Sequence, residues 1–576
     1  MEMTIFPRAS QPFSAIAILG LVGLCALGCA GTEANPGGAS GSPGGVGQAG
    51  SSATGGAGTG VGGSTGMPVD VSKGGPKLRV LTRTEYTNAI TDLFGTITTK
   101  LSLPEDTHKA GFVSVGGAEV AINSSSVELY ETAARAVAAE VFGDAARWQK
   151  LVGCQPKNDL SDECVLTFIK TVGKRAFRRD LADAEVQQWL KVGKDTSMLS
   201  TAAQGLAGIV SGFLQSPNFL YRVETNKLDA SNGRLKYDGA SMATRLAFLL
   251  TGYPPSETLL AQAAAGQLDT ADGIKTAAAP LLNDPKAVER MAEFFDEYAQ
   301  ADFVMAVQKS AVMYPDFSDA LRGSMLQATK LFIRNIVLAP GADVRGFFDS
   351  DQTFVDAILA PTYGVTPPAS GFAQVKLAPE SGRAGILGQA AVVAGHAQPD
   401  HTSPTRRGVF ITGTFLCQEA PPPPPGVLTD LPNDPNLTWR QKLELHRTLP
   451  ACAACHALFD PPGMAMEHLD SVGKYRTMEN GQPIDASGTL DGVAFNGVPQ
   501  LGAAMRSNAN ALNCMVSNFY RNANGVVHAT DDTAQVTALS QALTAKNFVW
   551  RDFVSEFVAS DAFRSAPAAV ITAGSQ

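Results

Sequence analysis

The clearest chemical pattern in the sequence is formed by Cys452, Cys455 and His456, in the run Cys-Ala-Ala-Cys-His. This CxxCH spacing is the attachment signature of c-type haem. On one helical turn, two thiols can bond the two vinyl groups of the porphyrin, and the adjacent imidazole can bind iron as the proximal ligand. The chain has only 8 Cys and 7 His, so chance matches are expected on the order of 0.001 times. The sequence therefore predicts one covalent haem c held by these three residues.

Two other interpretations of the same residues stay open. Cys452 and Cys455 could form a structural disulfide beside a histidine, because an exported chain meets an oxidising compartment. They could also form half of a site for another metal. A zinc site requires two further ligands, and no second CxxC or HxxxH lies nearby.

The residue that would bind iron opposite His456 is marked less clearly. The candidates within reach along the sequence are Met464, Met466, His468, Met505, His446 and His401. Met464 and Met466 follow His456 so closely that reaching the far face of the ring requires a tight reversal through the Asp-Pro-Pro-Gly run. Met505 lies 49 residues beyond His456 and follows a loop between Gly492 and Gly502. We favour Met505, with His446 or an open, water-bound iron as alternatives.

Four further cysteines, outside the N-terminal apolar segment, are candidates for disulfides. In an oxidising compartment Cys154 and Cys164 can staple a short loop, and Cys417 with Cys514 would tie a C-terminal unit to the haem unit. Free buried thiols at Cys417 and Cys514 are the alternative.

The N-terminus predicts export and a lipid anchor. Arg8 precedes an apolar run of sixteen residues, 13–28, which is short for a membrane span but typical of a secretory signal. The run ends Ala-Leu-Gly-Cys at Cys29, which resembles a bacterial lipoprotein signal. Ordinary cleaved secretion and an uncleaved anchor are the alternatives. We expect a membrane-anchored lipoprotein in the periplasm or at the cell surface.

Composition limits the partners and the domain plan. Residues 31–70 hold 15 glycines and only two charged residues, so they are predicted to be a flexible linker. The 576-residue chain carries 45 basic and 54 acidic residues, for a net charge of -9. This balance offers no electrostatic reason to bind nucleic acid. A chain of this length is expected to form several domains.

The hydrophobic periodicity is helical, so the predicted fold class is mostly α. Apolar residues recur at helical spacing in three stretches: Val127, Tyr130, Ala134, Val137 and Val141; Leu321, Met325, Ala328 and Phe332; and Trp550, Phe553, Val554 and Phe557. Ser125 with Glu128 predicts a capping box for the first stretch. Thr438 with Gln441 predicts another, for a short helix that ends at Leu449 before Pro450 and leads to the CxxCH.

Breaks in this pattern divide the chain into several consecutive helical units. Turn and proline clusters predict breaks at 153–162, 193–197, 360–382 and 421–436. The predicted parts are a signal peptide (1–28), the linker (29–76), an N-terminal helical domain (77–150), a small helical domain with a Cys pair (151–194), a central helical domain (195–365), a cytochrome c-like CxxCH domain (380–505) and a C-terminal helical domain (506–570).

Several segments resemble a family of exported planctomycete and myxobacterial proteins, built from consecutive domains of unknown function with a cytochrome c-like unit. The segments that carry the resemblance are 81–88, 175–179, 216–222, 245–249, 403–408 and 446–476. The resemblance covers about residues 78–565. It implies a haem c-containing, membrane-associated protein, and it implies no particular reaction. Asp460, Glu467, Asp470 and Asp485 fall in or beside the last segment, where helix caps or pairs with Arg476 are favoured over a calcium or acid–base site.

The sequence thus supports two classes of function. The first is a lipid-anchored c-type haem protein that transfers electrons to a redox partner protein, or that forms part of a haem-dependent oxidoreductase with a substrate site between Asp195 and Gly364. The second is a non-enzymatic surface binding or scaffold protein, for example for polysaccharide, whose CxxCH is a structural disulfide.

Overall fold

The computed structural model describes residues 69–70 and 78–570, apart from 198–200, 230, 420, 422–430, 433, 529–531 and 568. The predicted signal peptide, Cys29 and nearly all of the predicted linker lie outside the described residues. Helices α1–α24 dominate the described part, and its strands have two to four residues each. The prediction of a mostly helical fold is confirmed. No helix within the described ranges is long and apolar enough to cross a membrane.

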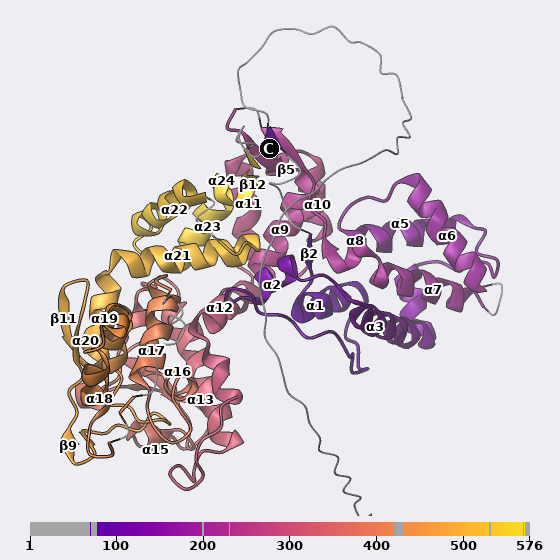
Figure 1. Ribbon diagram of the computed structural model, residues 1–576. Helices are drawn as coiled ribbons and strands as arrows, with labels where there is room; N and C mark the ends of the chain where they lie inside the picture. Colours follow the sequence, from indigo (N-terminus) through magenta and orange to yellow (C-terminus); the bar gives the residue numbers. More distant parts are fainter. Residues whose placement is uncertain are drawn as a thin grey trace, which may run out of the picture. The chain divides into compact units, whose positions relative to one another are not determined.

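One hydrophobic core is built by helices from the N-terminal part of the described chain (Figure 1). Its helices are α1 (Arg83–Phe94), α3 (Ser124–Gly143), α4 (Ala145–Val152), α5 (Glu163–Phe177), α6 (Asp183–Ser197), α7 (Ala202–Gln215) and α8 (Pro217–Leu220). Helix α7 packs against both α3 and α6. Buried Val137, Phe168 and Phe213 lie in this core.

Helix α3 confirms the predicted periodicity but not the predicted cap. Tyr130, Ala134, Val137 and Val141 are buried. The helix begins at Ser124, and the side chain of Asn123 accepts the cap hydrogen bond from the Ser126 amide. The capping box at Ser125 is therefore wrong, because Asn is as good an N-cap as Ser and here it lies two residues earlier. Val127 consequently lies in the first turn, outside the core, and is 55% exposed.

The break predicted near 193–197 lies a few residues later, because α6 runs through Ser197 and α7 begins at Ala202. Gly193 does not form a turn there. A Cβ atom at Gly193 would lie 2.6 Å from the Ile209 side chain, so the glycine allows α6 to approach α7 closely. The break predicted at 153–162 does separate α4 from α5.

A second core joins the middle of the chain to its C-terminal part. Its main helices are α2 (Val113–Glu119), α9 (Gly239–Thr251), α10 (Glu257–Ala264), α11 (Ala271–Leu282), α12 (Pro285–Ala299), α13 (Asp319–Phe332), α20 (Gly497–Ser507), α21 (Ala509–Asn524), α22 (Thr533–Ala545), α23 (Trp550–Ala559) and α24 (Asp561–Arg564). Trp550 of α23 stacks on Phe294 of α12. The periodicities predicted from Leu321 and from Trp550 are confirmed, since these residues are buried.

A small antiparallel sheet brings residues near the C-terminus into the same core. Strand β12 (Ser565–Pro567) pairs with β5 (Arg234–Tyr237), which pairs with β4 (Asn226–Asp229). Arg234 of β5 also pairs with Asp532, at 2.7 Å between Nη2 and Oδ2. The C-terminal segment thus completes the core of the central helices.

The CxxCH is positioned by a group of shorter elements. These are α16 (Ala390–Gly395), α17 (Pro404–Phe410), the π-helical turn η6 (Ile411–Phe415), α18 (Trp439–His446), α19 (Pro450–Met464), β10 (Ser487–Leu490) and β11 (Val493–Asn496). The capping box of Thr438 and Gln441 is confirmed. Helix α18 ends at His446, three residues before the predicted end, and Pro450 begins α19, because proline is tolerated in the first turn of a helix.

Candidate cofactor site

The two thiols and the imidazole of the CxxCH lie in the first turns of α19. Cys452 is buried and Cys455 is half-buried. These are the free cysteines among the described residues, and their sulfur atoms are not bonded to each other. The helix therefore presents two separate thiols beside His456 within about one turn.

The imidazole of His456 is oriented by Asp460, one turn further along α19. The His456 Nδ1 atom lies 3.0 Å and 3.1 Å from the two carboxylate oxygens of Asp460. Asp460 is buried, and Thr405 donates a hydrogen bond to its Oδ1 atom at 3.1 Å. Because a carboxylate accepts, the Nδ1 atom carries the hydrogen and the Nε2 atom keeps its lone pair for a metal.

The electrostatics of Asp460 combine two opposing effects. Burial raises the pKa of the Asp460 carboxyl, and the neighbouring His456 works against that rise. From the sequence, a helix cap or a pair with Arg476 was favoured for this residue over a calcium or acid–base site. The spacing of four residues between His456 and Asp460 on a helix was the signal that could have indicated this contact.

A second imidazole lies against His456. His446, at the end of α18, is buried, and its ring centroid is 4.8 Å from that of His456 in an edge-on arrangement. Burial is the main cause that lowers the pKa of His446. The Phe459 ring lies 4.8 Å from His456 as well. His456 is thus in contact with both an imidazole and an apolar ring.

Three large apolar side chains are exposed close to the thiols in sequence. Leu445 is 51% exposed, Leu449 is 49% exposed and Leu458 is 38% exposed. Leu458 follows Cys455 by three residues, so the two share one face of α19. Single exposed leucines are common on proteins. Of these three, Leu458 provides apolar surface on the face of α19 that carries Cys455.

Helix α19 is fixed against α17 by direct contact between their backbones. A Cβ atom at Gly408 of α17 would lie 1.8 Å from the Phe459 carbonyl oxygen. A Cβ atom at Gly463 of α19 would lie 1.9 Å from the Pro404 carbonyl oxygen. Both positions therefore require glycine. The helix that carries the CxxCH cannot shift without separating from α17.

A buried arginine fixes the chain that follows α19. Arg407 of α17 donates hydrogen bonds to the carbonyl oxygens of Met466, Leu469 and Asp470, each at 2.9 Å. Burial lowers its pKa to about 10, and the neighbouring Glu467 opposes that change. Glu467 also pairs with Arg476 at 2.8 Å. These contacts hold the segment after the site in place.

The other predicted iron ligands lie in different surroundings. Met464 is buried in the last turn of α19, which continues as a helix through Pro461 and Pro462, so the chain makes no reversal there. Met466 and Met505 are fully buried in the second core. Of the six candidates, His446 has the ring contact with His456 among the described residues.

The other two histidines among the six candidate ligands, His468 and His401, contact other residues. The His468 Nδ1 atom lies 3.0 Å from the Arg476 carbonyl oxygen. The His401 ring stacks on Trp439, with 4.8 Å between centroids.

The nearby carboxylates act as pairs and turn acceptors. Asp470 accepts hydrogen bonds from the Val472 and Lys474 amides, and Asp485 pairs with Arg440 at 3.2 Å. Within the described ranges, no group of three or more His, Cys, Asp or Glu could hold a metal ion.

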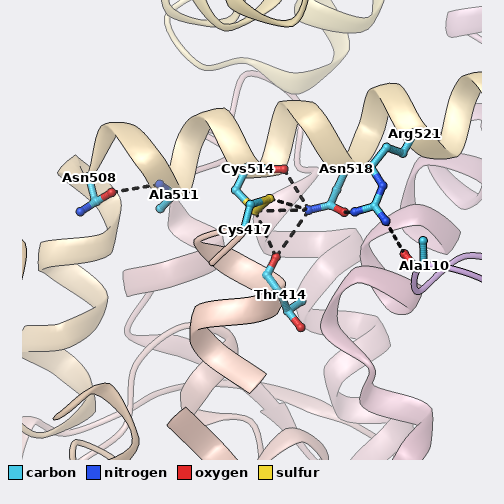
Figure 2. The surroundings of a disulfide bond; sticks show 8 residues. All are labelled: Ala110, Thr414, Cys417, Asn508, Ala511, Cys514, Asn518 and Arg521. Carbon is cyan, nitrogen blue, oxygen red and sulfur yellow. Dashed lines mark hydrogen bonds between the residues drawn. A yellow bond between two sulfur atoms is a disulfide. The ribbon is translucent and has the colours of Figure 1, made fainter. Parts of the chain in front are cut away.

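The structure contains both predicted disulfides. Cys154, in the connection after α4, is bonded to Cys164 in the first turn of α5. Cys417, just after η6, is bonded to Cys514 of α21. Figure 2 shows the second bond, where the Asn518 amide donates to the Cys514 carbonyl oxygen at 3.0 Å and to the Thr414 carbonyl oxygen at 3.5 Å. The loop that this disulfide closes includes the whole CxxCH.

Four segments of the chain match family models, and each family is described as a protein of unknown function. They are PSD3 (DUF1587) at residues 79–143, PSD5 (DUF1595) at 164–224, PSD4 (DUF1592) at 238–365 and PSCyt3 (DUF1588) at 383–479. All four are planctomycete cytochrome-like domains, and at that level the resemblance drawn from the sequence is confirmed. The cytochrome-like PSCyt3 segment near the C-terminus spans α17, α18, α19 and the CxxCH. No curated protein and no solved structure matches the chain.

Proposed function

We propose that the chain is an exported, lipid-anchored c-type haem protein that acts in electron transfer, as a carrier or as part of a haem-dependent oxidoreductase. The observation that carries the proposal is the arrangement on α19, where the free thiols of Cys452 and Cys455 precede a histidine that is oriented by buried Asp460. The match of residues 383–479 to a cytochrome-like family supports it.

The residues present fit a covalent haem. Cys452 and Cys455 each have a free sulfur atom for a thioether bond, and His456 has its Nε2 lone pair for iron. Asp460 holds the imidazole in one orientation and makes it a stronger ligand. The exposed leucines 445, 449 and 458 would exclude water from the edge of the ring. When bound, the haem iron supplies one-electron redox chemistry.

The test is covalent attachment. The chain should be produced together with the cytochrome c maturation machinery and stained for haem on a denaturing gel, because thioether bonds survive denaturation. The wild-type band should stain, and Cys455→Ser should weaken or lose the stain. The double variant Cys154→Ser/Cys164→Ser is the matched control, since it removes two cysteines far from α19 and should keep it. An unstained wild type would leave the scaffold interpretation.

The anchor is tested separately, because Cys29 lies outside the described residues. Cys29→Ser should release the protein from membranes, whereas Cys25→Ser should leave it bound, since only Cys29 stands at the lipidation position. Release of both variants, or of neither, would contradict a lipid anchor at Cys29. Retention of Cys29→Ser with its apolar run intact would point to an uncleaved anchor.

The second axial ligand stays a prediction, with Met505 as the choice from sequence and His446 as its rival. Met505 is fully buried in the second core, so binding iron would require that core to open, whereas His446 already lies against His456. A methionine ligand gives ferric haem a weak far-red charge-transfer band and a higher potential than a second histidine does. If Met505 binds, Met505→Leu should remove the band and Met515→Leu, another buried methionine, should keep it. A wild type without the band would exclude Met505.

A further inference from the structure

Where the three N-terminal matched segments meet, the protein buries more arginine than acid. Four arginines are buried there: Arg79, Arg178, Arg222 and Arg245. The buried carboxylates among them are Glu85 and Glu224. In two of these arginines, the side-chain N–H groups donate hydrogen bonds to backbone carbonyl oxygens. Arg178 donates to the carbonyl oxygens of residues 218, 219 and 221, and Arg79 donates to those of residues 522 and 523.

The side chain of Arg222 has no such hydrogen-bond acceptors among the described residues. It lies on β3 (Tyr221–Arg222), opposite Arg79 on β2 (Arg79–Val80), and its side chain has an exposed fraction of 0%. None of its three side-chain nitrogens has a hydrogen-bond partner in the described part of the chain. Its Nη1 atom is 3.7 Å from Glu85 and its Nη2 atom is 3.9 Å from Glu224, which are ion-pair distances too long for hydrogen bonds.

Both of those carboxylates are committed to other arginines. Glu224 accepts two hydrogen bonds from Arg245, at 2.8 Å and 3.0 Å. Glu85 accepts one from Arg290 at 2.9 Å and one from the Thr82 amide at 3.3 Å. Burial also raises the pKa of Glu297, which faces Arg290, to about 8, so this carboxyl adds little negative charge at neutral pH.

The Phe248 ring gives Arg222 only partial compensation. The guanidinium carbon lies 5.3 Å from the ring centroid, a cation–π contact that leaves the N–H groups without acceptors. Native proteins rarely leave a fully buried guanidinium without any acceptor, and an internal ion or water is the usual remedy. A positive excess of this kind favours an ion with negative charge.

We propose that Arg222 binds a small inorganic anion of the halide class at this junction. The anion would accept from the N–H groups that Glu85 and Glu224 do not reach, and it would balance the excess positive charge. Arg222 belongs to the PSD5 segment, Glu85 to the PSD3 segment, and Arg245 and Phe248 to the PSD4 segment. The anion would therefore fix three segments to one another, independently of any haem.

Diffraction from crystals of the exported chain prepared in bromide tests the site directly. Bromide scatters anomalously and replaces chloride in such sites. The expected result is an anomalous peak within hydrogen-bond distance of the Arg222 guanidinium. A peak without anomalous signal would identify water, and direct hydrogen bonds from Arg222 to Glu85 and Glu224 would leave no anion to bind. Either result overturns the proposal.

Thermal unfolding tests the same site in solution, in bromide against gluconate at equal ionic strength. A ligand released on unfolding should raise the wild-type midpoint by about 2 °C for each tenfold rise in bromide above its Kd. Arg222→Met should lose this dependence, and Arg178→Met, the matched buried arginine, should keep it. An equal response in wild type and Arg222→Met would show adventitious halide binding only and overturn the proposal. If Arg222→Met does not fold, the bromide crystals decide.

Discussion

The protein uses cysteine in two contrasting regions. Cys417 and Cys514 are joined at a packed junction, where Asn518 and the Thr414 carbonyl surround the bond (Figure 2). Cys452 and Cys455 stay free on a helix beside exposed leucines. Cysteine therefore forms a cross-link in the packed region. In the other region it supplies two reactive thiols beside exposed apolar side chains. The packed region should control stability, and the free pair should control cofactor attachment.

The largest expected effect comes from removing the cross-link at the packed junction. The Cys417–Cys514 bond joins residues 97 apart, and the Cys154–Cys164 bond joins residues 10 apart. Because a longer closed loop removes more entropy from the unfolded chain, Cys417→Ala/Cys514→Ala should lower the free energy of unfolding by about 5 kcal/mol. Cys154→Ala/Cys164→Ala should lower it by about 3 kcal/mol. Calorimetry of both double variants measures the difference.

An equal loss of unfolding free energy in the two double variants would contradict the comparison. The disulfide that closes the longer loop would then stabilise the protein no more than the short one does. A larger loss in Cys154→Ala/Cys164→Ala would reverse it. Haem staining adds a second readout. Neither double variant removes a thiol of α19, so both should still be stained if the cytochrome-like segment folds.

The second largest effect is expected where α17 contacts α19, the helix that carries the free thiols. Gly408→Ala places a Cβ atom 1.8 Å from the Phe459 carbonyl oxygen, so α17 and α19 must separate. We expect the free energy of unfolding to fall by about 3 kcal/mol, as for an overpacked core, and haem attachment to fall with it. Gly413→Ala is the control, since a Cβ there meets nothing within 4 Å. If Gly408→Ala attaches haem as well as Gly413→Ala does, the contact with α17 does not position the site.

Local patterns predicted the elements better than they predicted the contacts between them. The period in Leu321, Met325, Ala328 and Phe332 fixed α13, because a buried helical face repeats at short range. The Cys417–Cys514 pair was favoured only because four cysteines remained. Its partner segments lie 97 residues apart, and no local signal reports on such a distance.

Close backbone contacts and buried charge were the parts that the sequence could not predict. Gly193 reads as a turn in the sequence, yet it lies inside α6 and allows α7 to approach. Nothing in the sequence marks Arg222 as buried, because its burial depends on three segments that meet only after folding. At the site, the CxxCH was visible from spacing alone, whereas the contact of His446 with His456 depends on the angle between α18 and α19.

The smallest expected effect tests how completely the folded protein excludes water from α12. Glu297 of α12 is half-buried and accepts a hydrogen bond from the Val113 amide at 3.1 Å, and loss of solvent around its carboxyl raises its pKa from 4.5 to about 8. The folded protein thus keeps a proton that the unfolded chain loses above pH 4.5. The contribution of the Glu297 carboxyl to the free energy of unfolding is therefore fully present below pH 4.5. It is lost as the pH rises from 4.5 through 8.

Glu297→Gln keeps a neutral side chain that still accepts from Val113, so it should remove this pH dependence. Between pH 6 and 8 the wild type should lose about 2 kcal/mol of unfolding free energy more than the variant does. Denaturant titrations at several pH values measure the two slopes. Glu289→Gln, on the same helix with its side chain 60% exposed, should follow the wild type. If Glu297→Gln also follows the wild type, water reaches this part of α12 in the folded protein.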